Sequence, residues 1–521
     1  MDKYTAFTPT LIRHVARTGV FIAAVLAVIF LVWRKLPAGF LPEEDQGYVM
    51  VMVSTPEASS LQVTQKAMIR ADEVIRTLPE VASTSFAAGF NMMAGIASTS
   101  SGIIFVKLVD YSDRRLSAMQ IAQRLTGELY VAGAECFAFI PPSIPGLGIT
   151  SGVSVEVQDL EGRGTAYLLE QSERLMDSLR KLPSVASVTT QFNAGVPQRR
   201  LRIDKEQALA SGVDLGVLYG DLTTLLGGAY VNNFSRFGKL YQTYIQAAPA
   251  YRMDKRSLDS YYVASSSGES VPVSSLVEVV DTVGVEYVSQ FNLYRSIGLT
   301  VTPAARTSTT TVMQDITRTA AQVLPDDVGT AWSGTSFQEA NASKTGGLVY
   351  LLALVFVFLA LAALYESWGL PLAILMSVPV AVLGAVLFIG VSHLLNAFYV
   401  NDIYMQISLV MLIGLAAKNA ILVVEYADRL FNEQGASLMD AAIGAAKLRV
   451  RPIIMTAFAF ILGVMPLIFA SGVYATARNI MGVALVGGML FATLLGIFVY
   501  PALNFFGSMR HEGISLNLWS L

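Results

Sequence analysis

The stretch GLVYLLALVFVFLALAALY, residues 347–365, carries no charged side chain and decides the fold class. An α-helix rises ~1.5 Å per residue, so a helix of this length extends over ~28 Å. The hydrocarbon core of a bilayer is about 30 Å thick, and a spanning helix is apolar along nearly all of that length. The stretch therefore predicts a helix that crosses a membrane.

One run of similar character precedes this stretch and four follow it. The first, GVFIAAVLAVIFLVW, is short enough to be the apolar region of a signal peptide. However, Arg34 and Lys35 follow it without a small-residue cleavage site, which favours an uncleaved span. The sequence predicts six spanning helices in all, at residues 17–34, 345–364, 370–391, 404–427, 452–470 and 480–502.

Composition agrees with a membrane protein and excludes several other classes. Of the 521 residues, 53% are hydrophobic and 14% are charged, whereas soluble domains contain about 25% charged residues. The net charge of −3 gives no indication of a nucleic-acid partner. Cys136 is the only cysteine, and the three histidines (His14, His393 and His511) lie far apart. We expect no metal site, no cofactor, no catalytic residues and no enzymatic activity.

About 300 residues without a span separate the first two helices, which predicts one or more folded aqueous domains. Lys and Arg are enriched on the cytoplasmic side of membrane proteins. Eight of these residues place the N-terminus, the loop between the fourth and fifth spans, and the C-terminus in the cytoplasm: Lys3, Arg13, Arg17, Arg429, Lys447, Arg449, Arg451 and Arg510. Four oppose this: Arg34, Lys35, Lys344 and Arg478. The insert is therefore expected on the outer side of the membrane, which is the periplasm if the cell is Gram-negative.

The insert contains a faint internal repeat. Residues 71–83 (ADEVIRTLPEVAS) and 174–187 (RLMDSLRKLPSVAS) each read as a helix that ends at Leu-Pro before a strand, and a third version starts at Thr317. Leu-Pro is also a common helix stop, so chance is the alternative. The repeat favours α+β units with helices on one face of a sheet.

Lys418 lies in the middle of the fourth span, about ten residues from either end. A lysine there costs ~2.5–3.5 kcal/mol on insertion scales, so it needs an opposite charge or a wet cavity. A static ion pair between two helices is one interpretation. The other is a proton relay, in which a carboxylate titrates and Lys418 moves between partners. Glu366 and Glu425 lie near the membrane borders, so the acid is expected from elsewhere.

Several motifs resemble the AcrB/MexB type of transporter, from the hydrophobe/amphiphile efflux branch of the RND superfamily. The resemblance covers nearly the whole chain, and the motifs occur in the family's order. They are FLPEEDQG (40–47), GGAYVNNF (227–234), YRMD (251–254), WSGTSFQEA (332–340), ALYESW (363–368), GLAAKNAILVVE (414–425) and RPIIMTAFAFILGVMPL (451–467).

The resemblance implies the second half of a twelve-span pump, in which an aspartate pair of the first half faces the lysine. Lys418, Asn419, Thr456 and Arg449 match the family's relay region. The implied fold is a six-helix membrane bundle with a periplasmic α+β insert of repeated βαβ porter subdomains and a docking subdomain. The expected parts are the first helix (1–37), porter subdomains (38–202), the docking subdomain (203–289), a porter return (290–343), five helices (344–508) and a cytoplasmic tail (509–521).

A drug-binding pocket rich in phenylalanine is also implied. Ordinary core packing is the alternative for such residues, since phenylalanines alternating on a strand are usually core. Aromatic rings and methionines suit varied lipophilic ligands because their contacts are non-directional. The residues that match are Phe90, Phe105, Phe86, Met92, Phe137 and Phe139.

The function implied is the antiport of lipophilic or amphiphilic drugs against protons, as a homotrimer with a periplasmic adaptor and an outer-membrane channel. The missing first half would supply the aspartates. The last residues, NFFGSMRHEGISLNLWSL, depart from the family's charged tail, with a natural variant, a frameshift and an assembly artefact as the alternatives. The start at Met1 suggests a truncated reading frame. Alternatives are an accessory or non-functional subunit that docks to a full pump and a metal-exporting relative.

Overall fold

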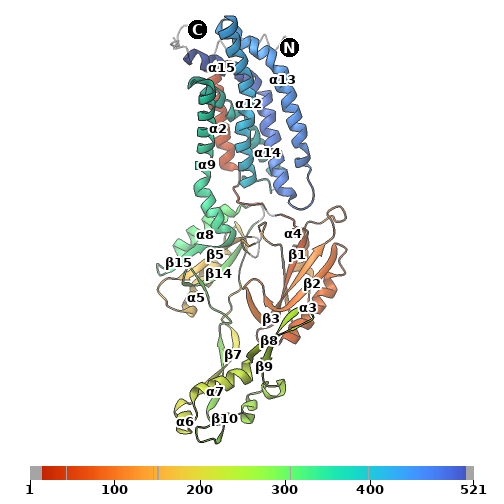
Figure 1. Cartoon of the computed structure of the whole chain (residues 1–521), viewed down its shortest axis with the longest axis vertical. Coiled ribbons are helices and arrows are strands. Elements are labelled where there is room, and N and C mark those ends of the chain that lie inside the picture. The colour runs from red at the N-terminus through yellow and green to blue at the C-terminus, as the bar shows by residue number, and fades with distance from the viewer. Residues whose placement is uncertain are drawn as a thin grey trace. The chain divides into compact units, whose positions relative to one another are not determined.

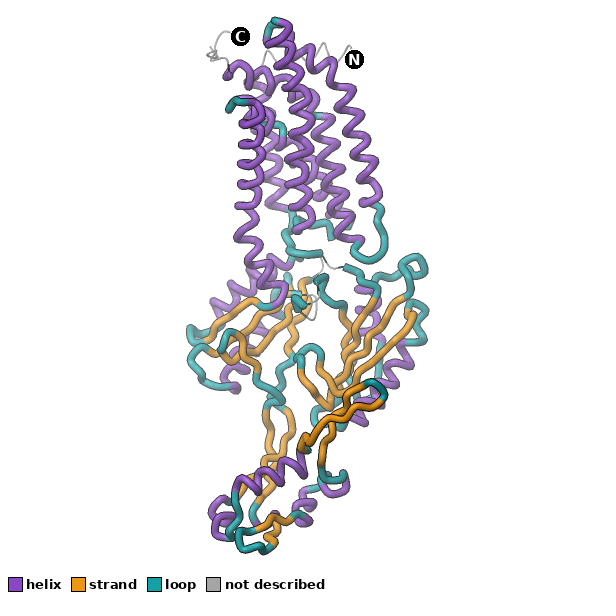
Figure 2. Tube along the Cα trace, in the orientation of Figure 1, coloured by secondary structure: helices purple, strands orange, loops and turns teal. Residues whose placement is uncertain are grey.

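A computed structural model describes residues 15–42, 44–144, 146–148, 152–304, 307–396 and 398–511. Most of the tail expected at 509–521 lies outside the described residues. The chain divides into two compact units, Met1–Phe192 with Val288–Leu521, and Asn193–Tyr287. Figure 2 shows helix along the spanning region and strands only in the insert.

The prediction of six helices long and apolar enough to span a membrane is confirmed for the described residues. They run side by side in Figure 1. One span, Gly369–Leu395, consists of two consecutive helices, α10 and α11. The spans are formed by α2 (Val15–Lys35), α9 (Gly334–Tyr365), α10 (Gly369–Leu375) with α11 (Val378–Leu395), α12 (Ile403–Gln434), α13 (Leu438–Ile468) and α14 (Ala475–Leu494). Helix α15 (Gly496–His511) follows α14 after Leu495.

Helix α13 begins fourteen residues before the start expected at 452. Residues 438–451 carry charges and fall outside an apolar window, but they are rich in alanine, the strongest helix former. The helix therefore extends beyond the apolar stretch, and Pro452 lies inside the helix. A hydropathy profile therefore finds the apolar part of a helix, but it does not find the residue at which the helix begins.

The centre of the bundle consists of α11, α12 and α14. Of an 18-residue apolar window in each span, 61%, 56% and 67% of the residues are buried, against 17% for α2, 6% for α9 and 17% for α13. Glycines allow the close approach of α14 to its neighbours. A Cβ on Gly487 would lie 2.5 Å from Cγ of Phe388 on α11, and one on Gly488 would lie 2.3 Å from Cδ1 of Leu412 on α12.

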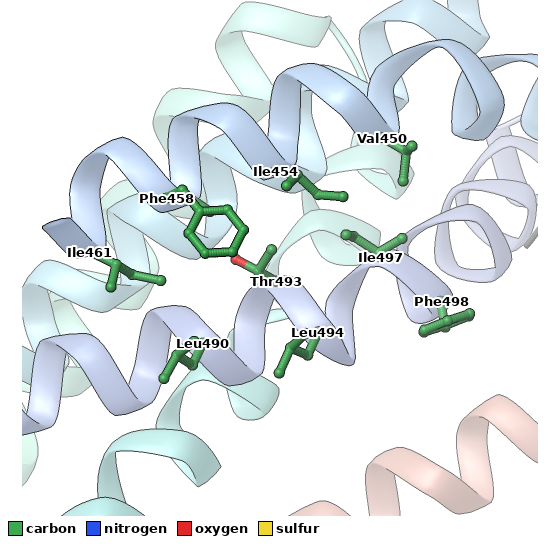
Figure 3. A pocket seen from close by; sticks show the side chains of 10 residues that line it. Val450, Ile454, Phe458, Ile461, Leu490, Thr493, Leu494, Ile497 and Phe498 are labelled. Carbon is green, nitrogen blue, oxygen red and sulfur yellow. The ribbon is translucent and has the colours of Figure 1, made fainter. Parts of the chain in front are cut away.

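An apolar pocket of 340 Å³ lies between α13 and the α14–α15 segment. Phe458 of α13 points toward Thr493 of α14 across it (Figure 3). Phe458 and Leu494 are more than half exposed, so the pocket opens on the outside of the bundle.

The insert begins with an antiparallel sheet in the order β2-β3-β1-β4. Two helices cover one of its faces, where Val51, Ile104, Met68 and Ile121 belong to one buried cluster. The elements follow as β1 (Tyr48–Ser54), α3 (Leu61–Ile75), β2 (Val81–Asn91), β3 (Ile96–Leu108), α4 (Ala118–Glu128) and β4 (Glu135–Phe139).

A second sheet repeats this topology. Strand β14 pairs with β5 and β6, and β15 pairs with β5, giving the order β6-β14-β5-β15. Helices α3 and α5, which end near the first two Leu-Pro pairs, each follow the first strand of their sheet. Helices α4 and α8 each precede the last strand of their sheet. The elements are β5 (Val153–Asp159), α5 (Thr165–Leu179), β6 (Val185–Thr190), β14 (Tyr294–Pro303) with the short β13 (Ser289–Phe291), α8 (Thr309–Val323) and β15 (Val328–Trp332).

The unit Asn193–Tyr287 is inserted in the sequence between β6 and β14. It has a small core of its own around Leu218, Val263 and Leu276. Its role as a docking subdomain remains a prediction. Its elements are β7 (Val196–Ile203), α6 (Lys205–Ala210), α7 (Leu215–Leu222), β8 (Ala229–Arg236), β9 (Lys239–Ile245), β10 (Tyr262–Ala264), β11 (Ser270–Pro272) and β12 (Val277–Gly284).

Candidate functional site

Lys418 is exposed on α12, midway along a helix that spans Ile403–Gln434. Ile407, Met411 and Gly414 precede it at helical spacing and are exposed on the same stripe. The other side of the helix is packed into the bundle through residues such as Leu412 and Ala416. The lysine is thus directed away from this set of helices.

Within the described part of the chain, no carboxylate forms an ion pair with Lys418. Glu425 lies 3.9 Å from Arg429, one helical turn along α12. Glu366 is exposed at the end of α9, in the left-handed conformation with φ 48°. That the partner acid of Lys418 comes from elsewhere stays a prediction.

The other predicted relay residues are not joined to Lys418 by a hydrogen bond in the described structure. Asn419 is fully buried, and neither of its amide atoms has a hydrogen-bond partner among the described residues. The hydroxyl of Thr456 donates to the carbonyl of Ile453 at 3.1 Å, within its own helix. The guanidinium of Arg449 lies 4.7 Å from the ring centre of Tyr426. Their roles in a relay remain predictions.

The first sheet presents an aromatic face opposite its helix-covered side. Met50 of β1 pairs with Phe105 of β3 on one side and with Phe139 of β4 on the other, so these side chains form a row across the sheet. Phe137 lies two residues along β4 and stacks on Phe139 with ring centroids 5.9 Å apart. Phe105 and Phe137 are about 40% exposed, at 36% and 41%.

Phe90 and Met92 lie with this aromatic face, and Phe86 does not. Phe90 pairs with Ala97, which shares a face with Phe105, and Met92 packs against the buried cluster of Met50 and Phe139. Phe86 pairs with Ile104, which belongs to the core under the helices. The register shifts between Ala88 and Phe90, at Gly89 with φ 91°, so the simple alternation of faces is broken there.

Sequence reasoning missed two buried carboxylates at one end of the bundle. Asp402 is fully buried at the start of α12; its Oδ1 accepts the amide of Met405 at 2.8 Å, and its Oδ2 has no partner among the described residues. Glu44 is 3% exposed. Burial raises the pKa of Asp402 to about 7 and raises the pKa of Glu44 as well. In the sequence, Asp402 looks like any aspartate that caps a helix. Only its burial in the structure distinguishes it from an exposed capping residue.

We expect Asp402→Asn to stabilise the chain more at pH 8 than at pH 5, with a difference of ~2 kcal/mol between the two pH values. Because burial raises the pKa of Asp402 above its unfolded value of 3.8, the folded state favours the protonated acid. The free energy of unfolding of the unsubstituted chain should therefore fall as pH rises from about 4 to about 7. Asparagine resembles the protonated acid and keeps the bond to Met405. Thermal unfolding in nanodiscs at both pH values measures the difference.

The matched control is Asp204→Asn, since Asp204 caps α6 by accepting the amide of Gln207 at 2.9 Å on an exposed surface. Asp204→Asn should not increase the free energy of unfolding at pH 8. An equal change at pH 5 and pH 8 in Asp402→Asn would contradict the assignment.

Comparison with known proteins identifies the family. Residues 1–506 match the AcrB/AcrD/AcrF family over nearly the whole chain. The chain belongs to the AcrB/AcrD/AcrF family. It is 36% identical over 522 residues to the toluene efflux pump membrane transporter TtgB of Pseudomonas putida, with 98% of this chain and 49% of that protein covered.

Two Escherichia coli K12 proteins of the AcrB type are similar over a comparable extent. The multidrug resistance protein MdtF is 34% identical over 520 residues, with 98% of this chain and 49% of that protein covered. The multidrug export protein AcrF is 32% identical over 507 residues, with coverages of 96% and 48%. The chain spans about half the length of these relatives, and the resemblance to an AcrB-type pump half is confirmed.

Proposed function

We propose that this chain is the C-terminal half of an inner-membrane pump that exports lipophilic or amphiphilic compounds in exchange for protons. The observation that carries the proposal is Lys418, a cation at the centre of a span that faces away from its own bundle. Such a residue is costly in lipid and therefore marks an ion pathway when a second helix set supplies its partner.

The partner acid is proposed to lie on an N-terminal half. The relatives are about twice as long as this chain, which leaves room for that half. Exposed apolar residues on α9 and α13, including Phe356 at 67% and Met455 at 65%, give a second set of helices, or lipid, a surface to cover.

The aromatic face of the first sheet is the proposed drug-binding surface. It combines three half-exposed phenylalanines, Phe90, Phe105 and Phe137, with Met50, Met52 and Met92. Rings and thioethers make contacts that adapt to many apolar shapes. TtgB and MdtF are named for toluene and for multidrug resistance, which fits apolar substrates of several kinds.

The remaining partners follow from family resemblance. We propose that the insert lies in the periplasm, that the unit Asn193–Tyr287 docks to an outer-membrane channel, and that a periplasmic adaptor and two further copies complete the pump. The alternative is an accessory subunit that binds a complete pump without moving protons.

The decisive experiment measures dye efflux in cells that lack their own pumps. The chain is expressed alone and then with a separate first half taken from TtgB. We expect efflux only with the complement. Efflux by the chain alone would place the proton site within these residues and overturn the relay. No efflux in either case, with both proteins present in the membrane, would favour the accessory function.

A further inference from the structure

Glu44 caps helix α14 from far away in the sequence. Its Oε1 accepts the amide of Ala477 at 2.7 Å and its Oε2 accepts that of Thr476 at 3.3 Å. The residue before α14, Tyr474, makes no side-chain hydrogen bond to the helix. A carboxylate at a helix N-terminus satisfies free amides and interacts favourably with the helix dipole. Glu44 therefore ties the segment before β1 to the bundle.

Asp45, the next residue, makes the same kind of contact with the first sheet unit. Its Oδ2 accepts the amide of Ala118, the first residue of α4, at 2.6 Å. Its Oδ1 accepts from Nη2 of Arg114 at 2.8 Å, and that guanidinium side chain is 1% exposed. A buried, charge-assisted contact of this kind resists separation, because breaking it leaves an unpaired charge.

The connection from these two carboxylates to the aromatic face is short. Strand β1 starts at Tyr48, three residues after Asp45, and its Met50 lies between Phe105 and Phe139. The intervening residue Gln46 is also fixed, since its side-chain Nε2 donates to the carbonyl of Pro142 at 2.8 Å. Hydrogen bonds therefore restrain the segment between Glu44 and the strand.

The connection from Glu44 to the membrane lysine runs through two packed helices. Helix α14 lies against α12, where Gly488 is so close to Leu412 that a Cβ would clash. Lys418 lies six residues beyond Leu412 on the same helix. A shift of α12 against its neighbours would thus reach α14 by direct contact, since packed helices transmit displacement rather than absorb it.

We propose that Glu44 and Asp45 form a clasp that transmits movement of α14 to the aromatic face of the first sheet. The two residues act as positioning residues for drug transport and touch neither the drug nor Lys418. This inference rests on the proposed efflux function. A simple capping role would affect stability alone, whereas the clasp predicts a loss of turnover at unchanged substrate affinity.

The first test uses Glu44→Ala in the pump completed with the TtgB first half. We expect the maximal rate of dye efflux to fall about tenfold, with the KM for dye within about twofold of the unsubstituted pump, because the aromatic face stays intact. Glu44→Gln keeps one amide acceptor and should recover part of the rate. The control Ser308→Ala removes the side-chain cap of α8, in which the Ser308 hydroxyl accepts the amide of Thr311 at 3.2 Å, and should leave the rate unchanged. A normal rate in Glu44→Ala, or a loss that matches reduced protein in the membrane, would overturn the clasp.

The second test needs no transport and so separates failure of the clasp from failure of the proposed function. Hydrogen–deuterium exchange is measured on the purified chain in nanodiscs. Glu44→Ala should speed exchange about tenfold at Thr476 and Ala477 and should also speed it in β1, residues 48–54. Faster exchange at α14 with unchanged exchange in β1 would mean that Glu44 is a cap only.

Discussion

Lys418→Ala in the completed pump is expected to reduce proton-driven efflux at least a hundredfold, to the level of cells without a pump. Removing a group that takes part in proton transfer typically costs about 10²–10⁴ in rate. The amount of protein in the membrane should change little, since Lys418 is exposed on α12 and has no ion pair within the described residues. Efflux of a fluorescent dye against an imposed pH gradient in proteoliposomes measures the effect.

Met411→Ala is the matched control for this substitution. Met411 lies on the same exposed stripe of α12, two turns before Lys418, and is 44% exposed. Its loss removes side-chain volume and no charge, so efflux should remain within about twofold of the unsubstituted pump. Undiminished efflux in Lys418→Ala would remove the lysine from the mechanism and leave a structural role for it.

Gly487→Leu is expected to prevent stable folding of the bundle. A Cβ at this position would lie 2.5 Å from Cγ of Phe388 and 2.9 Å from the carbonyl oxygen of Gly384, so α14 would have to move away from α11. Overpacking of a core costs ~1–3 kcal/mol, and a clash with backbone costs more. Because folded proteins are only marginally stable, we expect less than about a tenth of the normal amount of monodisperse chain after detergent extraction.

Gly463→Leu provides the control for helix propensity and added apolar volume. Gly463 lies in α13, and a Cβ there would have no atom within 4 Å. This variant should be extracted in normal amounts and appear at the usual volume in size-exclusion chromatography. Equal yields of the two variants would show that the close contact of α11 and α14 contributes little to the stability of the bundle.

The two predictions concern different properties of the same bundle. Lys418 lies on its outside and should matter for activity, while Gly487 lies at its centre and should matter for folding. The clasp of Glu44 and Asp45 would join this bundle to the sheet that carries Phe105. The proposed proton site and the proposed drug-binding face would then be linked through the packed helices α12 and α14.

The sequence by itself determined the six spans, because a helix that crosses a membrane is apolar along nearly all of the stretch inside the hydrocarbon, and a hydropathy profile detects that stretch. It also singled out Lys418, since a charge inside such a span is costly and rare. The helices that precede each Leu-Pro were predictable for the same local reason, as their periodicity and their stop signals lie in adjacent residues.

Only the tertiary structure decided which distant segments meet. The shift at Gly89 separates Phe86 from Phe90, although strand alternation alone would place both on one face. Glu44 meets the amides of Thr476 and Ala477 more than four hundred residues away, and Asp402 differs from an exposed helix cap only by its burial. Local periodicity encodes the type of each element, whereas these contacts depend on how the elements pack, and the packing energy is spread over residues far apart in the chain.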